Sequence, residues 1–245
     1  MAEFDDLAPA TAPALWPDAA DRQGSDRDPR RYTVAYAPNP GSLAWLAGSH
    51  WLGRCAASLQ PLRQLAIEGV DAQELHRLTA EPRRAGWHAA WMPPFALVPG
   101  ADWLGLHHAL QTLAEGLEPL ALPPLHVERV GDRLALVAPA SHACHAALRG
   151  IAAACEARLR PLADGAPVAV GAEFRFHLPL TGPLEQIDAR TQTLVFDAAL
   201  EYFSDLPLLR LDSLALFAQD APGADFVLLD HLEMNGAAAR AGAGA

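Results

Sequence analysis

The stretch Gly86-Trp87-His88-Ala89-Ala90-Trp91-Met92-Pro93-Pro94-Phe95 places one histidine in the middle of a short apolar run. A second stretch repeats this plan: Glu173-Phe174-Arg175-Phe176-His177-Leu178-Pro179-Leu180-Thr181-Gly182. If each run is a strand, alternate side chains point to opposite faces. One face of each strand is then apolar and suited to a core, while the other carries a single imidazole among small or polar groups. The pattern therefore predicts two strands that each present a histidine, His88 or His177, to a cleft.

The segments that follow the two histidines also resemble each other. After His88, apolar residues recur with helical spacing over 103–117, and two strand-like runs follow at 122–130 and 133–137, hinged at Gly131-Asp132. After His177 comes a helical pattern over about 185–203, followed by strand-like runs at 207–217 and 226–231. The sequence predicts two strand-helix-strand-strand halves, each contributing one histidine.

The remaining elements are marked by their ends. An alternating strand is expected over Arg31 to Pro38, and Ser42 and Gly53 are expected to bound a helix that ends near Leu52. Asp71 is expected to cap a short helix to Leu78, and Ser141 a longer one over 142–159. Residues 31–235 are predicted to form a single two-lobed domain. Residues 1–30 and 236–245 lack periodicity and are expected to be disordered tails.

Composition limits the classes of protein and partner. The 245 residues are 51% hydrophobic and 19% charged, as in a soluble globular protein, and contain no apolar run long enough to span a membrane. No secretory signal is recognisable, and three cysteines without a C-x-x-C pair suit a reducing cytoplasm. Residues 31–245 keep a net charge of −7 of the total −11, which disfavours an extended nucleic acid as partner. The chain has no lysine, so a bound anion must rely on arginine, histidine or backbone N–H groups.

The motifs resemble those of a known superfamily. The segments in question are Arg31-Tyr-Thr-Val-Ala-Tyr-Ala-Pro-Asn-Pro-Gly-Ser, Trp51-Leu-Gly-Arg, Pro82-Arg-Arg, Trp87-His-Ala, Pro93-Pro-Phe, Glu173-Phe-Arg-Phe-His and Leu180-Thr-Gly. Together they resemble, in the same order over 31–232, the phosphonate-operon branch of the two-histidine (2H) phosphoesterases. The resemblance implies an α+β, LigT-like fold of two pseudo-symmetric lobes with antiparallel sheets, outer helices and a central cleft. It also implies hydrolysis of cyclic phosphates or phosphodiesters without a metal or other cofactor.

The chemistry of this superfamily explains the paired histidines. One imidazole accepts a proton from the attacking water and the other donates one to the departing alkoxide, and an unperturbed pKa of about 6.5 allows either role. The resemblance makes His88 and His177 the catalytic residues. In the H-x-T or H-x-S motif of relatives, a hydroxyl two residues further on binds the phosphoryl oxygens. This chain has Ala90 and Pro179 at those positions, and Met92 where relatives tend to have lysine.

Other residues are candidates for substrate binding. Arg175 and Thr181 share the predicted strand face of His177, and Tyr36 could reach in from the first strand. The alternatives are that Arg175 pairs with Glu173 and that Tyr36 is a core residue. His142 and His145 have helical spacing but no carboxylate partner in register, so no metal site is expected.

Three hypotheses for function follow. The first is a metal-independent hydrolase of a small cyclic phosphate or phosphodiester, for which the resemblance implies a sugar or nucleotide cyclic phosphate from phosphonate breakdown. The second is a repurposed enzyme that uses the two histidines on a less charged small molecule. The third is a non-catalytic binding protein. The expected partner is a small-molecule substrate. No membrane is expected as a partner, and the protein is expected to be a monomer.

Overall fold

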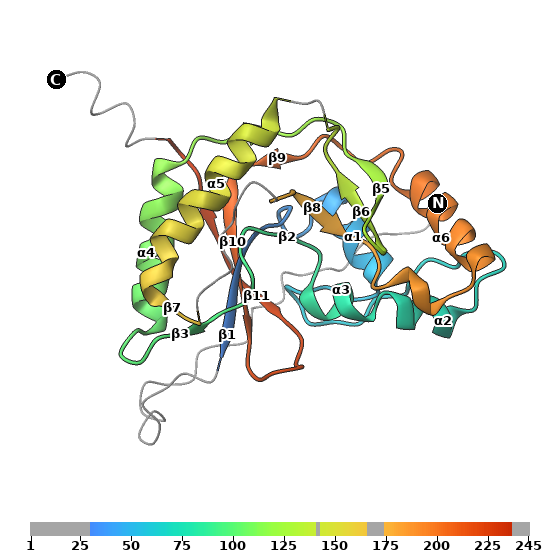
Figure 1. Cartoon of the computed structure of the whole chain (residues 1–245), viewed down its shortest axis with the longest axis horizontal. Coiled ribbons are helices and arrows are strands. Elements are labelled where there is room, and N and C mark those ends of the chain that lie inside the picture. Colours follow the sequence, from blue (N-terminus) through green and yellow to red (C-terminus); the bar gives the residue numbers. More distant parts are fainter. Residues whose placement is uncertain (1–29, 141–142, 166–173, 237–245) are drawn as a thin grey trace, which may run out of the picture.

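The computed structural model describes residues 30–140, 143–165 and 174–236. It is a mixed α/β fold with several antiparallel sheets (Figure 1). The two expected disordered tails, apart from Arg30 and Gly236, lie outside the described residues, as does the expected helix cap Ser141. Among the described helices, none combines the length and apolar character needed to cross a membrane.

The larger sheet has the strand order β11-β10-β1-β2 and is antiparallel throughout. Its strands are β1 (Arg31–Tyr36), β2 (Ala89–Ala90), β10 (Ser213–Gln219) and β11 (Val227–Glu233). Helices α4 (Trp103–Gly116) and α5 (Cys144–Leu159) pack against each other, and α4 covers β10 and β11 (Figure 1). The strand expected from Arg31 and the helix expected over 103–117 are thus confirmed.

The second sheet has the order β5-β6-β8, formed by β5 (His126–Val130), β6 (Arg133–Val137) and β8 (His177–Pro179). Gly131 allows the hairpin between β5 and β6 because its φ is +63°, a left-handed conformation that favours glycine. Helix α6 (Ala189–Tyr202) packs against β5. Two short pairs complete the strands: β3 (Ala96–Leu97) with β7 (Ala163–Asp164), and β4 (Leu120–Ala121) with β9 (Arg210–Leu211).

The two sequence halves exchange their hairpins. The β5–β6 hairpin follows His88 in the chain, yet it pairs with β8, the strand of His177. The β10–β11 hairpin follows His177, yet it lies in the sheet that contains β2. The halves are therefore not separate units in space. The period-two pattern fixes the face of each strand but not its partner, so the sequence did not reveal this exchange.

The helix ends follow their sequence signals closely. The Ser42 Oγ accepts the Trp45 N–H at the start of α1 (Leu43–Leu52), and Gly53, with φ +81°, ends it. Asp71 caps α2 (Ala72–Leu78) as expected. Helix α3 (Ala80–Ala85) was not predicted, because six residues give too little periodicity for a signal. Two 3-10 turns, Arg160–Leu162 and Leu184–Gln186, complete the helical segments.

The two histidine strands are shorter than the alternation predicts. Within the expected strand over 86–92 the structure forms β2 at Ala89–Ala90, and within the described residues of the one expected over 173–181 it forms β8 at His177–Pro179. Pro93, Pro94 and Pro179 lack the N–H that a ladder requires, which limits extension. β2 and β8 nevertheless lie against each other, each at the edge of its own sheet (Figure 1).

We expect Gly48→Ala in α1 to lower the free energy of unfolding by about 1–3 kcal/mol, the usual cost of overpacking a core. A Cβ at Gly48 would lie 1.8 Å from Cδ2 of the buried Trp87. The control is Gly150→Ala in α5, where no atom lies within 4 Å of the new Cβ. That variant should gain about 0.5–1 kcal/mol from helix propensity. Chemical denaturation measures both changes, and an equally stable Gly48→Ala would contradict this packing.

Candidate functional site

His88 lies in the short passage between α3 and β2. Gly86, just before it, crosses the larger sheet so closely that a Cβ there would sit 2.9 Å from the Ala56 Cβ and 3.3 Å from the Phe217 Cε1. The centroid of the His88 ring lies 4.6 Å from that of Phe217. Phe217 is on the same sheet face as Ala35, which is opposite Ala90 in the register. His88 and Ala90 therefore lie on one side of the sheet, as the sequence predicts.

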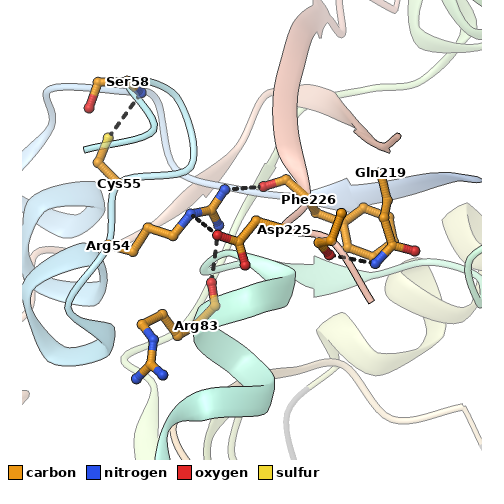
Figure 2. Close-up of polar contacts among 8 residues, drawn as sticks. Arg54, Cys55, Ser58, Arg83, Gln219, Asp225 and Phe226 are labelled. Atoms are coloured by element: carbon orange, nitrogen blue, oxygen red, sulfur yellow. Dashed lines mark hydrogen bonds and ion pairs between the residues drawn. The ribbon is translucent and has the colours of Figure 1, made fainter. Parts of the chain in front are cut away.

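A buried arginine fixes the backbone that leads to His88. The Arg54 guanidinium donates to the carbonyls of Arg83, at 3.0 Å, and Phe226, and forms an ion pair with Asp225 at 3.3 Å (Figure 2). The Phe226 N–H in turn donates to the Arg84 carbonyl at 2.8 Å. The end of α3 is thus tied to the start of β11, which holds the following turn and His88 in place.

Burial makes His88 a neutral imidazole. His88 is only 7% exposed. This burial is the main reason why its pKa is lowered to about 4. The His177 ring lowers the pKa further, while the nearby Ala85 backbone acts in the opposite direction. The Nδ1 atom is buried and has no hydrogen-bond partner. At neutral pH, His88 therefore carries no charge and can accept a proton.

His177 is held in one tautomer by its own strand. Its Nδ1 donates to the carbonyl of Arg175 at 2.8 Å, so Nδ1 carries a hydrogen. In the neutral ring the lone pair is then on Nε2, and in the protonated ring Nε2 becomes a second donor. The side chain is half-buried.

The fold brings the two histidine segments together. Trp91, directly after β2, packs against Phe176, directly before His177, with ring centroids 5.6 Å apart. β2, which follows His88, and β8, which begins with His177, also contact each other. Two imidazoles in different environments can act as a base and an acid on one small molecule.

The other predicted site residues lie in different surroundings. The Arg175 Nη2 forms an ion pair with the Glu128 Oε2 at 2.6 Å; Glu173, its expected alternative partner, lies outside the described residues. The Thr181 Oγ1 is fully buried and accepts the Leu134 N–H at 2.9 Å. Neither of these two interactions involves His88.

Tyr36 lies on the other side of the sheet. It is opposite Ala89 in the register, so its side chain points away from the face of Ala90. The ring packs against Phe176 with centroids 5.7 Å apart, and burial and the nearby Asp212 both raise its pKa. The structure thus places Tyr36 in the core that supports the site.

The two positions where relatives carry a hydroxyl group differ in exposure from the position where they tend to carry lysine. Ala90 is exposed and Pro179 is half-buried, so both remain accessible. Met92 is 2% exposed and belongs to the main core, although the alternation predicted that it shares the face of Ala90. The prediction for Met92 was wrong because β2 ends at Ala90, after which the chain bends toward Pro93.

Sequence reasoning missed two residues on the face of His177. In the register, Val137 lies opposite both His126 and His177, and Ala135 lies opposite both Glu128 and Pro179. Cross-strand partners share a face, so His126 and Glu128 lie on the same side of the sheet as His177. The signal was present as the i, i+2 spacing of His126 and Glu128, but it required knowledge of which strands pair.

Two hollows in the described surface lie away from the histidine pair. One of 650 Å³ is lined by apolar and polar residues of the segment 62–66 and of α2. Another of 320 Å³ contains His107, which forms an ion pair with Asp230 at 2.8 Å. Within the described ranges, no three His, Cys, Asp or Glu side chains are grouped to hold a metal ion.

The low pKa of His88 predicts a pH-dependent stability. Between pH about 4 and about 6.5 the unfolded chain binds a proton at this residue and the folded chain does not, so stability rises with pH across that window and is lost on acidification. This pKa difference of His88 changes the free energy of unfolding by at most about 3 kcal/mol across the window. Denaturation at several pH values should show a flatter curve for His88→Gln. His177→Gln should keep most of the slope, because burial is the larger cause, and an unchanged slope in His88→Gln would refute the assignment.

Comparison with known proteins gives two curated relatives of about twice the length. The ribose 1,5-bisphosphate phosphokinase PhnN of Janthinobacterium sp. (strain Marseille) is 29% identical over 237 residues, covering 86% of this chain and 52% of that protein. The protein of the same name from Laribacter hongkongensis (strain HLHK9) is 30% identical over 225 residues, covering 81% of this chain and 50% of that protein. The chain therefore spans about half the length of these relatives.

Among solved structures, Usb1 of Kluyveromyces marxianus shows a distant likeness. Its complex with uridine monophosphate is 11% identical with a TM-score of 0.31, covering 82% of this chain and 99% of that one. A second structure of Usb1 is 13% identical with a TM-score of 0.32, covering 84% of this chain and 100% of that one. These values are too low to support an argument. A family model, described as "Protein of unknown function (DUF1045)", matches residues 91–169 and 165–227, and the chain belongs to this family.

Proposed function

We propose that this protein hydrolyses a small cyclic phosphate or phosphodiester by acid/base catalysis with His88 and His177. The observation that carries the proposal is the contact between β2, which directly follows His88, and β8, which begins with His177, two edge strands of different sheets. The resemblance to the 2H phosphoesterases supports the reaction type and implies that it needs no metal.

The two environments suggest the role of each histidine. The neutral, buried His88 would take a proton from the water that attacks phosphorus. His177, protonated at Nε2, would donate its proton to the alkoxide as the ring P–O bond breaks. A charged His177 also helps to keep His88 neutral, because like charges disfavour a second protonation. Exchange with solvent would then restore both rings.

Ribose-derived cyclic phosphates are the first substrates to test. The curated relatives are named for ribose 1,5-bisphosphate, a sugar with phosphoester groups. Their phosphokinase activity is not transferred to this chain, which matches only about half their length. The 245 residues also contain no lysine and therefore no G-x-x-x-x-G-K-[ST] phosphate-binding loop.

Replacing either histidine tests the proposal. His88→Gln and His177→Gln should each lower kcat for a ribose cyclic phosphate by about 10²- to 10⁴-fold, the usual contribution of one proton transfer. A chelator should leave the wild-type rate unchanged. His107→Gln is the matched control, since His107 pairs with Asp230 outside the site. Full activity in either variant would exclude paired acid/base catalysis.

Restoring one hydroxyl tests whether the site is a weakened esterase. Ala90→Thr should raise kcat for a cyclic phosphate, by up to about 10²-fold if the hydroxyl becomes a preorganised oxyanion donor. Ala90 is exposed, so the larger side chain fits, and Ala121→Thr in β4 is a control at another exposed strand alanine. Lysine is not restored at Met92, because the charge would be buried in the core. An unchanged or lower kcat would favour other chemistry.

A second candidate function is acid/base chemistry on a less charged molecule. It is favoured by the apolar surroundings of His88, whose ring packs on Phe217 and whose charged form is disfavoured. Under this reading Ala90→Thr would not improve turnover of a cyclic phosphate, and phosphate itself would not inhibit.

A further inference from the structure

We infer that the 650 Å³ hollow between the segment 62–66 and α2 is a second ligand site, which binds a small amphipathic anion. The ligand is a free molecule with an apolar body and one carboxylate, sulfonate or phosphate group. The volume lies within the range of about 300–1,000 Å³ that small-molecule sites occupy. The hollow is lined by neither His88 nor His177, so the inference does not depend on the proposed hydrolysis.

Half of the lining is apolar. The segment 62–66 and α2 supply these side chains, which are Leu62, Leu65, Ala66, Ala72 and Leu75. Leu75 is buried, whereas Leu62 and Leu65 are half-buried and still meet water. A ligand that covers such surface gains about 25 cal/mol for each Å² of apolar area removed from water. The hollow therefore favours a ligand with an apolar body.

The charged residues of the lining are basic. Arg63 and Arg77 line the hollow, whereas none of the residues that line it is acidic, in a chain of 29 acidic and 18 basic residues. Within the described part of the chain neither guanidinium has a hydrogen bond or an ion pair, in contrast to Arg54 and Arg133, which pair with carboxylates. Both can form forked hydrogen bonds with an anion.

Gln64 holds the wall of the hollow in place. Its Nε2 donates to the Trp51 carbonyl and to the Thr79 Oγ1, each at 2.9 Å. The Leu62 N–H donates to the Gly53 carbonyl, also at 2.9 Å. These bonds tie the segment to the ends of α1 and α2. A site that is formed before the ligand arrives loses less entropy on binding.

His76 adds a polar atom to the site. The amide nitrogen of Gln64 already donates to a carbonyl, so its Oε1 is the acceptor that faces the His76 Nδ1 at 3.2 Å. Nδ1 therefore carries the hydrogen, which leaves Nε2 for a ligand. Ala72, Gln73, His76 and Arg77 all line the hollow and are spaced i, i+1, i+4 and i+5, so they share one side of α2. One ligand can thus contact His76 and Arg77 together.

The two halves of the lining define the ligand class together. Sulfate or phosphate alone would leave the apolar surface in water, and a neutral apolar molecule would make no use of the arginines. A lipid bilayer presents its charges on a broad surface, whereas a hollow of this volume encloses one small molecule. A free amphipathic anion satisfies both halves.

The test uses three probes on the full chain at constant ionic strength. Anilinonaphthalene sulfonate has an apolar body and a charge, N-phenylnaphthylamine has the same rings without the sulfonate, and sulfate has the charge alone. Fluorescence reports the two aromatic probes, and displacement of the first reports sulfate. The wild type should bind anilinonaphthalene sulfonate more tightly than either of the others.

Variants of the lining locate the binding. Arg63→Gln and Arg77→Gln should each weaken binding of anilinonaphthalene sulfonate about two- to fivefold, the range of an exposed ion pair, and leave N-phenylnaphthylamine unchanged. The effects should multiply in the double variant. Ala72→Glu should also weaken the anionic probe without loss of stability, because a carboxylate is favourable in the first turn of a helix.

Matched controls separate this site from other arginines and from the histidine pair. Arg149→Gln removes an exposed arginine of α5 that does not line the hollow and should bind all three probes like the wild type. His88→Gln and His177→Gln should do the same. If these two variants lost binding of the probe while Arg63→Gln kept it, the probe would occupy the histidine site and the inference would be wrong.

Further outcomes would overturn the inference. These are no binding of anilinonaphthalene sulfonate, equal affinity in the wild type and the double variant, or wild-type affinity no greater than for sulfate. Phosphatidylglycerol vesicles that bind the wild type but not the double variant would identify a membrane surface instead. A dimer in light scattering that the double variant dissociates would identify a second copy of the chain.

Discussion

Trp91 packs between Phe174 and Phe176, with ring centroids 6.0 and 5.6 Å away, and this contact joins the two histidine segments. Tyr36 adds a third ring against Phe176 from the first strand. Such aromatic pairs contribute about 0.5–1.5 kcal/mol each beyond the area they bury. The Trp91 Nε1 is buried without a hydrogen-bond partner, so packing in the core rather than hydrogen bonding holds this side chain. The contact between β2 and β8 therefore depends on how these rings fit together.

The exchange of hairpins makes the candidate site a property of the whole domain. His177 is held on β8 by a hairpin from the first half of the sequence, and β2 belongs to a sheet completed by the second half. Neither half could position its own histidine without the other. Such non-local pairings must overcome the entropy of closing long loops, so the site and the domain should form together.

Environment distinguishes two residues that are chemically identical. His88 is enclosed by Phe217 and the turn after α3, so its charged form is disfavoured. His177 is half-buried, and its tautomer is set by the Arg175 carbonyl. Arg175 in turn is held by Glu128. Different burial and different partners, rather than different residue types, separate the two imidazoles, and this asymmetry is what acid/base chemistry at a single pH requires.

The sequence by itself determined the local elements and the two histidine positions. Ser42, Gly53 and Asp71 marked helix ends because side chains and glycine act within one turn, and apolar spacing located α4 and α6. Only the tertiary structure decided which strands pair, and hence that Met92 and Tyr36 enter the core, that Thr181 bonds to Leu134, and that Glu128 reaches Arg175. Alternation along a strand gives the face of a side chain, whereas its neighbours on that face come from segments distant in sequence, which no local pattern encodes.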